Sequence, residues 1–395
     1  MKALIYTHEF PPFQGGLATT SCKLAKGFQE AGVHTTVLAP TYSKEDRLAD
    51  KNFNFVVRRM GILARNHGVP SPIREIAGLL SLSRYLSINT PPPDVLLLIT
   101  REAHLVGGIG LDPNKYRIIV RAAGYEAKRF LLGKKWKNRL LGSIMNRLYK
   151  QADKIVGPSQ STKRLFAESG IPDSRLKVIH NGINRNTILR EADCEETQQF
   201  RKKYGVENSE KVILTVSRLV QGKGQDKVIE ALSDVRKKYE NFKYIIAGEG
   251  SYEKALKELA RNYRLEDKVV FAGPVRHEEV WSFYDSCDIF AMVNRTISSK
   301  ENIEGLPNVL IEAASRGKPI ITGTDGGSEE AVEHGESGYV VDGNDTGRIA
   351  EHIIDLISDE DKSKRFGERG REKMLDEFTE EEMIKQYLQI VGHRK

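Results

Sequence analysis

The sequence predicts an α/β protein with two doubly wound halves, each built on a parallel sheet covered by helices. Three observations support this fold class. Short apolar segments alternate with helical patterns along the whole chain, which is typical of parallel sheets. The pattern restarts near residue 210. The chain has 395 residues, which is enough for two domains of ordinary size.

The expected strands fall into two groups along the chain. In the first half they cover residues 3–6, 35–39, 95–99, 117–121, 154–156 and 177–179. In the second half they cover residues 212–216, 243–247, 269–272, 289–293, 319–322 and 338–340. Helices are expected between them, with the first over roughly 18–31. Apolar positions recur at helical spacing over 380–391 and predict a closing helix.

The best domain boundary is the His-Asn-Gly-Ile-Asn segment at 180–184, because it combines a strand end with Asn-Gly turn chemistry. A polar stretch then separates it from the next strand. We therefore expect an N-terminal domain over residues 1–182 and a C-terminal domain over residues 183–378. Residues 379–395 should form a helix that packs back against the first domain.

Composition narrows the class of protein. Hydrophobic content of 39% and charged content of 29% are typical of a globular chain, and no apolar run predicts a membrane-spanning helix. The first residues turn polar too soon for a signal peptide. The three cysteines, Cys22, Cys194 and Cys287, have no metal-type spacing and favour a reducing, cytoplasmic location. A net charge of +7 indicates an anionic partner.

The segment Glu-Gly-Leu-Pro-Asn-Val-Leu-Ile-Glu, residues 304–312, is the most informative stretch. Pro307 suits the first turn of a helix, because its missing N–H needs no intrahelical partner there. Free amides in this turn would face an anion. Glu304 and Glu312 flank them, which suits a ligand with central phosphates and hydroxyls at both ends, such as a nucleotide sugar. Taken alone, two solvated glutamates would be the simpler interpretation.

Glycines follow the first expected strand. Gly15 and Gly16 end the Pro-Pro-Phe-Gln-Gly-Gly segment, where they allow a backbone to approach a ligand closely. The following helix would point its N-terminus at the same place, although a simple turn explains the pair equally well. The glycines at 107–110 lack the G-x-G-x-x-G spacing, which argues against a dinucleotide oxidoreductase.

The second half begins with a strand that leads into Ser-Arg-Leu-Val-Gln-Gly-Lys-Gly, residues 217–224. Arg218 can bind two phosphate oxygens and Lys223 supplies a point charge. The segment is not a P-loop, and a solvated basic loop is its simpler interpretation in isolation. Later strands end in Gly-Glu-Gly at 248–250 and Phe-Ala-Gly-Pro-Val-Arg at 271–276. Ligands of open α/β sheets bind at such strand ends.

Taken in order, these motifs resemble glycosyltransferase family 4, whose members are retaining, nucleotide-sugar-dependent enzymes. The resemblance adds a Gly-Gly-x-x-Glu motif near residue 326 and is strongest over residues 210–345. It implies the GT-B fold, in which two Rossmann-like domains face each other across a cleft. Within the family, the chain is most similar to mannosyl- and other hexosyltransferases of lipid and cell-envelope polysaccharide synthesis.

The resemblance also implies residue roles. Arg218, Lys223 and Glu304 are the catalytic candidates: the two cations would stabilise charge on the donor diphosphate, and Glu304 would contact sugar hydroxyls. Glu312 would hold the ribose, and Val275 and Arg276 would lie beside the base. The donor-binding candidates, with Glu312, Val275 and Arg276 included, are Gly15, Gly16, Gly248, Glu249, Val275, Arg276, Gly305, Leu306, Pro307, Asn308 and Glu312. Same-face attack would need no protein nucleophile, metal ion or cofactor, and we interpret the D-x-D string at 359–361 as a solvated surface.

One position departs from the family pattern. Ala123 stands where a histidine of a His-Gly-x-Glu segment is expected, and alanine offers no donor or acceptor. The donor sugar could lack the hydroxyl concerned, another side chain could replace the histidine, or the protein could bind without turnover. The candidates on the acceptor and sugar side are Arg121, Tyr125, Glu126 and His104.

Residues 128–154 carry nine Lys or Arg residues and one acid, interspersed with Trp136 and leucines. This composition suits the headgroup region of an anionic membrane. A core helix with a solvated charged face is the alternative. No nucleic-acid reader motif accompanies the charge, so nucleic acid is not an expected partner.

We therefore expect a metal-independent retaining glycosyltransferase. The expected partners are a UDP- or GDP-sugar donor, a lipid-linked or other envelope glycan acceptor, and the inner face of the membrane. The alternatives are a non-catalytic nucleotide-sugar or glycan-binding protein, which only Ala123 supports, and a nucleotide-sugar epimerase of the same fold.

Overall fold

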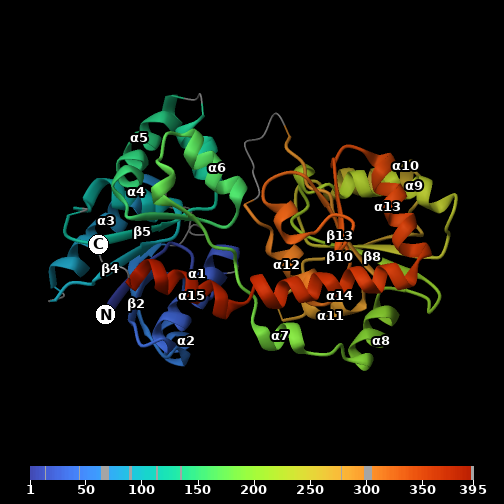
Figure 1. Ribbon diagram of the computed structural model, residues 1–395, viewed down its shortest axis with the longest axis horizontal. Coiled ribbons are helices and arrows are strands. Elements are labelled where there is room, and N and C mark those ends of the chain that lie inside the picture. Colours follow the sequence, from blue (N-terminus) through green and yellow to red (C-terminus); the bar gives the residue numbers. More distant parts are fainter. Residues whose placement is uncertain are drawn as a thin grey trace. The chain divides into compact units, whose positions relative to one another are not determined.

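The computed structural model describes residues 1–13, 15–43, 45–63, 71–88, 91–112, 114–133, 136–276, 278–297 and 305–392. The chain forms two compact units (Figure 1). Unit 1 combines Met1–Asn181 with Glu380–Lys395, and unit 2 is Gly182–Thr379.

Unit 1 is built on a seven-stranded parallel sheet in the order β3-β2-β1-β4-β5-β6-β7. Its strands are β1 (Lys2–Tyr6), β2 (His34–Thr41), β3 (Val56–Leu63), β4 (Val95–Leu98), β5 (Arg117–Arg121), β6 (Lys154–Gly157) and β7 (Leu176–Val178). Its helices are α1 (Gly16–Glu30), α2 (Asp46–Ala49), η1 (Asp50–Asn52), α3 (Ser71–Ile88), α4 (Arg101–Gly110), η3 (Ala127–Leu131), α5 (Trp136–Gln151), α6 (Gln160–Glu168), η4 (Asp173–Arg175) and α15 (Glu380–Gly392).

Both faces of this sheet are buried, as the continuous apolar strands require. Alternate residues of β1 enter different cores: Leu4 and Tyr6 pack with α3, α4 and α5, whereas Ala3 and Ile5 pack with α1 and α15. Helix α15 lies against α1, where an added Cβ at Gly27 would stand 2.4 Å from Ile384. The strand β3 was not among the expected elements.

Unit 2 is built on a six-stranded parallel sheet in the order β10-β9-β8-β11-β12-β13. Its strands are β8 (Lys211–Val216), β9 (Phe242–Ala247), β10 (Val269–Gly273), β11 (Ile289–Met292), β12 (Ile320–Gly323) and β13 (Gly338–Val341). Its helices are α7 (Arg185–Leu189), α8 (Cys194–Lys203), η5 (Gln221–Lys223), α9 (Gln225–Arg236), α10 (Glu253–Asn262), α11 (Val280–Ser286), α12 (Asn308–Ser315), η6 (Ser328–Ala331), α13 (Thr346–Ser358) and α14 (Glu360–Glu377).

Helices α9, α10 and α13 pack on one face of the second sheet, and α11, α12 and α14 pack on the other. The predicted fold class, two doubly wound parallel α/β sheets, is therefore confirmed. In each sheet the strand order reverses beside the first strand, between β1 and β4 and between β8 and β11. Such reversal points, at the carboxyl ends of the strands, are where doubly wound sheets bind ligands.

Candidate active site

The strand-end loops of unit 2 are bonded to one another through main-chain groups. Leu219 N donates to Glu249 O at 2.9 Å, and Gly248 N donates to Gly273 O at 2.8 Å. Gly248 has φ 137°, and an added Cβ would stand 1.9 Å from Ser217 O. The glycine is therefore required for the close approach. The structure thus brings the Arg218 loop and the Gly-Glu-Gly loop together, with Arg218 and Glu249 exposed.

Lys223 ends the short helix η5, immediately before α9. Its backbone N–H donates to Val220 O, and the side chain is largely buried. The next residue, Gly224, has φ 83°, and an added Cβ would meet Val293 O at 2.2 Å. The turn that carries Lys223 is therefore fixed against the end of β11 by main-chain contacts.

A buried ion pair that the sequence did not reveal supports this turn. Arg295 donates to both carboxylate oxygens of Asp226, at 3.0 and 2.6 Å, and both side chains are about 6% exposed. Arg295 N also donates to Gly222 O at 3.0 Å, beside Lys223. The Tyr252 hydroxyl donates to the same aspartate at 3.2 Å. The pair joins the loop after β11 to the first turn of α9.

The 304–312 segment is described from Gly305 onwards, so Glu304 lies outside the described residues. Pro307 is the N-cap of α12 and precedes its first helical residue, Asn308. It was expected inside the first turn, but its φ of −67° and extended ψ of 120° suit the position just before the helix. Leu306 is buried in the core beneath this end of the helix.

Glu312 is half-buried on α12, and its Oε2 accepts a hydrogen bond from the Tyr284 hydroxyl at 2.7 Å. Tyr284 is itself fully buried in α11. The phenol fixes one carboxylate oxygen and thereby orients the whole group, which is an arrangement suited to accepting hydrogen bonds from a ligand diol.

The two residues predicted to lie beside the base follow β10. Val275 is half-buried and packs against the core shared by α11 and α12. Arg276 is exposed and forms an ion pair with Glu279, one turn further along the chain.

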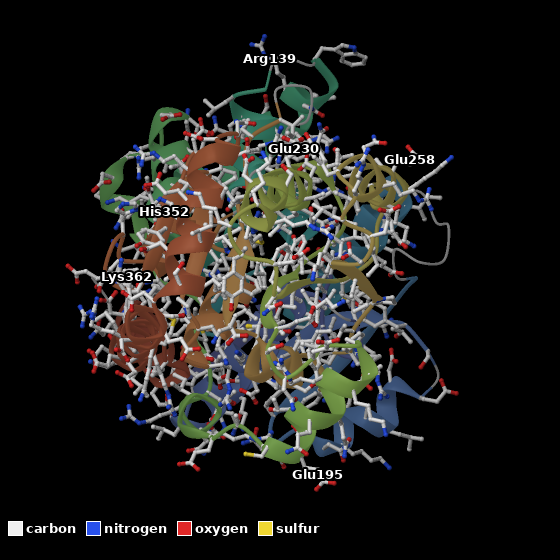
Figure 2. All side chains as sticks on the ribbon, turned by 90° about the vertical axis from the view of Figure 1, so that its right-hand side faces the viewer. Arg139, Glu195, Glu230, Glu258, His352 and Lys362 are labelled. Carbon is white, nitrogen blue, oxygen red and sulfur yellow. The ribbon has the colours of Figure 1, made fainter. Side chains whose placement is uncertain are left out.

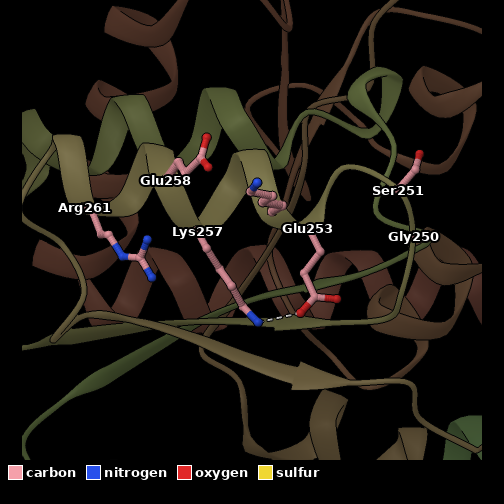
Figure 3. Close-up of a pocket in the computed structure, with 7 residues that line it drawn as sticks. Gly250, Ser251, Glu253, Lys257, Glu258 and Arg261 are labelled. Atoms are coloured by element: carbon pink, nitrogen blue, oxygen red, sulfur yellow. Dashed lines mark hydrogen bonds and ion pairs between the residues drawn. The ribbon is translucent and has the colours of Figure 1, made fainter.

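An open hollow of about 530 Å³ lies along α10. It is lined by Gly250, Ser251, Glu253, Lys254, Lys257, Glu258 and Arg261. Figure 3 shows Lys257 reaching Glu253, with a 2.6 Å ion pair, whereas Glu258 points away from this pair. Lys257 also lies over the Phe271 ring at 5.3 Å. Because its cation already has these neighbours, we interpret the hollow as a solvated helix face.

In unit 1, Gly15 is the N-cap of α1 and Gly16 is its first residue, so the helix begins two residues earlier than expected. Both glycines are exposed at the carboxyl end of β1. Helix α1 therefore begins shortly after β1, and the binding of an anion by its first amides stays a prediction.

Three of the acceptor-side candidates are buried. The Arg121 guanidinium donates to Ile179 O at 2.9 Å and to Asn181 Oδ1 at 2.5 Å, close to where the chain leaves unit 1. His104 lies in the core, where its Nδ1 contacts the Tyr149 hydroxyl at 3.1 Å, and burial lowers its pKa to about 4. These two side chains stabilise the interior of unit 1.

Glu126 and Tyr125 belong to the turn that follows β5. Glu126 Oε2 accepts from the Ala123 N–H at 3.1 Å, and burial raises the pKa of Glu126 to about 7. Tyr125 is half-buried and contacts Phe130 edge to face. Where the family carries a histidine, this chain therefore has a half-buried methyl group on a turn closed by Glu126.

Among the described residues, no group of three or more His, Cys, Asp or Glu side chains is placed to hold a metal ion. Asp359, from the D-x-D string, is the N-cap of α14, where it accepts a hydrogen bond from Lys362 N at 2.9 Å. Metal independence remains a prediction.

Comparison with known proteins agrees with the fold. The family model for glycosyl transferases group 1 matches residues 196–373, and the model for glycosyltransferase family 4 matches residues 14–187. The two family models show a glycosyltransferase, and the doubly wound pair of sheets gives it the GT-B fold. The chain belongs to the family 4 glycosyltransferases.

Two relatives illustrate the similarity. The GDP-mannose-dependent alpha-(1-6)-phosphatidylinositol monomannoside mannosyltransferase of Mycobacterium tuberculosis is 27% identical over 378 residues, which cover 94% of this chain and 93% of the relative. The GDP-mannose-dependent monoacylated alpha-(1-6)-phosphatidylinositol monomannoside mannosyltransferase of Corynebacterium glutamicum is 28% identical over 384 residues, which cover 97% of this chain and 95% of the relative.

Two solved structures share the fold. Anabaena Alr3699/HepE in complex with UDP has a TM-score of 0.80 at 21% identity, over 99% of this chain and 100% of that chain. WaaG, a glycosyltransferase involved in lipopolysaccharide biosynthesis, has a TM-score of 0.71 at 17% identity, over 99% and 100%.

Proposed function

We propose that this glycosyltransferase moves a sugar from a UDP- or GDP-sugar to a hydroxyl of a lipid-linked or other envelope glycan, with retention and without a metal ion. The observation that supports this most is the bonded set of strand-end loops in unit 2. It places Lys223 and Arg218 on neighbouring parts of one loop at the strand-order reversal. The names of the mannosyltransferase relatives make GDP-mannose the first donor to test.

In this proposal the acceptor oxygen attacks the anomeric carbon on the face that the diphosphate leaves. The bond from that carbon to the phosphate oxygen breaks, the new glycosidic bond forms, and the acceptor proton passes to a phosphate oxygen. Negative charge grows on the departing diphosphate, so Lys223 and Arg218 would stabilise the transition state more than the ground state. Glu312, oriented by Tyr284, would hold the ribose hydroxyls.

Thermal unfolding in the presence of UDP, GDP, ADP and TDP, with and without EDTA, tests the donor class. A nucleotide at 100 times its Kd adds about 2.7 kcal/mol to the free energy of unfolding. We expect UDP or GDP to stabilise the chain equally well with EDTA. Donor consumption is then followed by NMR with GDP-mannose and UDP-sugars, where an α-linked product from an α-linked donor shows retention.

Stabilisation by neither UDP nor GDP would contradict the proposed donor class. Stabilisation that EDTA abolishes would contradict metal independence, and a product of inverted configuration would contradict the same-face mechanism.

We further propose that unit 1 contacts an anionic membrane through α3 and α5. On α5 the exposed positions include Trp136 at 72%, Leu140 at 62%, and the cations Arg139, Arg147 and Lys150. Figure 2 shows Arg139 projecting from the surface. Aromatic and aliphatic side chains beside cations suit a headgroup layer.

The exposed face of α3 adds an apolar stripe that the sequence reading did not single out. Ile73, Ile76 and Leu80 follow helical spacing and are all more than half exposed. On the opposite face of the helix, Gly78 packs against Tyr6 and His8, at the carboxyl end of β1. Helix α4 lies between α3 and α5 and contacts both (Figure 1). Among the described residues, no helix is both long and apolar enough to span a bilayer.

Sedimentation with phosphatidylcholine vesicles, with and without phosphatidylglycerol, tests this surface. We expect binding only to the anionic vesicles, and a loss of at least about a hundredfold in the Trp136→Ala/Leu140→Ala variant, since each of the two large side chains contributes about 1.5–3 kcal/mol when buried and about 1.4 kcal/mol is a factor of ten. Leu189→Ala is the control, because Leu189 is also an exposed leucine, at 50%, and lies on α7 of unit 2. Equal binding by both variants would contradict the assigned surface.

A further inference from the structure

We propose that Arg59 and Tyr42 are positioning residues that hold the described part of the glycine loop of unit 1, residues 11–13, 15 and 16, in its ligand-binding conformation. The inference deepens the proposed function and rests on it, because it assumes that this loop binds the donor diphosphate. Neither residue belongs to a motif of the sequence. Both come from the β2–β3 region, far along the chain from the loop they contact.

The Arg59 guanidinium binds the loop directly. Its Nη2 donates to the carbonyl oxygen of Pro11 at 2.6 Å. The same nitrogen and Nε donate to the two carboxylate oxygens of Asp50, at 2.6 and 2.9 Å. Nη1 donates to Pro40 O at 2.9 Å, at the end of β2. One planar cation therefore joins the loop, the β2 end and helix η1 through four hydrogen bonds.

The surroundings of Arg59 make this arrangement rigid. Its side chain is only 2% exposed, and Asp46 provides a second, completely buried carboxylate at 3.9 Å. The guanidinium lies over the Phe10 ring, 5.6 Å from its centroid. Phe10 is itself fully buried next to Phe53 and Phe55. A buried guanidinium with four hydrogen bonds cannot move easily, so it restrains the backbone of the loop that it binds.

Tyr42 holds the other side of the loop. Its hydroxyl donates to His8 O at 2.9 Å and accepts from Phe10 N at 3.3 Å. Its ring stacks on Phe13, with centroids 5.7 Å apart. Phe13 in turn lies against Gly15, since an added Cβ there would stand 3.2 Å from the Phe13 ring. The contacts therefore run from the tyrosine to the N-cap of α1.

This arrangement has a functional consequence because the loop offers backbone amides and no cation. Amides contribute to anion binding only when they already point at the ligand, since otherwise binding must supply the cost of ordering them. Arg59 and Tyr42 would supply that order in advance. Their loss should weaken the binding of phosphates and leave the binding of the base and ribose unchanged.

Calorimetric titration of the full chain separates these effects. The ligands are UDP and GDP, compared with uridine and guanosine, which lack the phosphates. For Arg59→Met we expect the Kd of the bound diphosphate to rise about tenfold, with a smaller rise for Arg59→Lys and about threefold for Tyr42→Phe. The Kd of the matching nucleoside should not change. Tyr42→Phe leaves no buried charge unpaired, so it tests the proposal even if Arg59→Met fails to fold.

Arg236→Lys is the matched control. Arg236 also forks onto an aspartate, Asp267, at 3.0 and 3.2 Å, and donates to the Arg264 carbonyl. It ends α9, and its partner Asp267 precedes the amino end of β10. It should change neither Kd. If diphosphate and nucleoside weaken equally, or if neither changes in Tyr42→Phe and Arg59→Lys, Arg59 and Tyr42 are structural only. If the unsubstituted chain binds neither UDP nor GDP, the proposed function itself fails, and this inference with it.

Discussion

Both units support a glycine-containing loop with a buried arginine–aspartate fork, but they use it differently. In unit 1 the Arg59 guanidinium bonds to the loop itself through the Pro11 carbonyl. In unit 2 the Arg295 side chain bonds to Asp226, and the loop is held through the main chain, by Arg295 N and Gly222 O. The loop of unit 1 carries no cation, whereas that of unit 2 carries Arg218 and Lys223.

The difference indicates a division of tasks. A loop that offers only amides depends on its shape, so the guanidinium acts on its backbone. A loop that presents a lysine depends on the position of the lysine backbone. The Arg295–Asp226 fork therefore fixes the two elements next to Lys223, which are the first turn of α9 and the loop after β11. Variants of the two forks should therefore fail in different ways.

Removal of Asp226 should have the largest effect on stability. Asp226→Ala leaves the Arg295 charge buried and unpaired, which costs about 3–5 kcal/mol. Asp226→Ala/Arg295→Met removes both charges and should regain most of this loss. Urea unfolding of the two variants measures the difference. If the single and double variants had the same free energy of unfolding, the Arg295–Asp226 pair would be hydrated in solution, which would contradict its burial in the structure.

Lys223→Ala should remove one positive charge of the loop without changing the fold of unit 2. The fork of unit 2 stays intact, so folding should be unaffected, while kcat should fall about 10²–10³-fold, as for loss of other groups that stabilise transition-state charge. Initial rates at saturating donor measure this effect. Lys227→Ala is the control, because Lys227 pairs with Glu230 at 2.6 Å on the neighbouring helix. Similar rates for the two variants would remove Lys223 from the mechanism.

Unit 1 also contains a buried carboxyl group, Glu126, whose behaviour with pH sharpens the contrast with the forks. Burial raises its pKa from 4.5 to about 7. The folded state therefore holds the proton more tightly than the unfolded state, and stability is lost as pH rises from about 4.5 to about 7. Burial lowers the pKa of His104 from 6.5 to about 4, so its contribution is lost as pH falls through that range. The two slopes oppose each other.

Glu126→Gln removes only the first slope and keeps an acceptor for the Ala123 N–H. Relative to the unsubstituted chain, the variant should become more stable as the pH rises from 5 to 7. The gain in the free energy of unfolding should reach about 3 kcal/mol, because each unit of pKa shift corresponds to about 1.36 kcal/mol. Urea unfolding at three pH values measures this gain. A difference that does not vary with pH would mean that Glu126 is hydrated in solution.

Glu312→Ala should have a smaller effect than Asp226→Ala and Lys223→Ala. We expect donor Kd to rise about tenfold, because the ribose hydroxyls lose a charged acceptor worth about 1.5–3 kcal/mol per bond. Nucleotide titration measures the change. Tyr284→Phe keeps the carboxylate and removes its partner, so it should weaken binding less. An unchanged Kd in Glu312→Ala would place the ribose elsewhere.

The fold was accessible from the sequence because buried parallel strands are continuous apolar runs bounded by turn residues. The missed strand, β3, shows the limit of that signal. It lies at the edge of its sheet, contains adjacent arginines, and begins with the half-exposed Val56. From the sequence alone, Arg58 and Arg59 suggest a polar loop. Only the folded structure shows that Arg59 is paired with Asp46 of α2 and Asp50 of η1.

Candidate site residues could be predicted where they belong to a local motif, as in the Lys223 loop and the 304–312 segment, and their roles stay predictions. Residues whose role depends on a partner far away in the sequence could not be predicted. Arg295 and Asp226 lie 69 positions apart, and neither stands out by type or spacing. Arg121 and His104 were expected on the acceptor side as side chains that could replace the family's histidine, but tertiary packing directs both into the interior of unit 1.

The division of unit 1 into two stretches of sequence has a consequence for synthesis. Its core needs Met383, Tyr387 and Val391 of α15 to cover α1 and the sheet, and these residues leave the ribosome only after the whole of unit 2. During synthesis, the apolar face of unit 1 that α15 covers therefore stays exposed until the end of the chain is made, whereas unit 2 is continuous in sequence and can fold before then. A nascent chain of this protein should need chaperone protection at α1, and a premature stop before Glu380 should damage the unit that was made first.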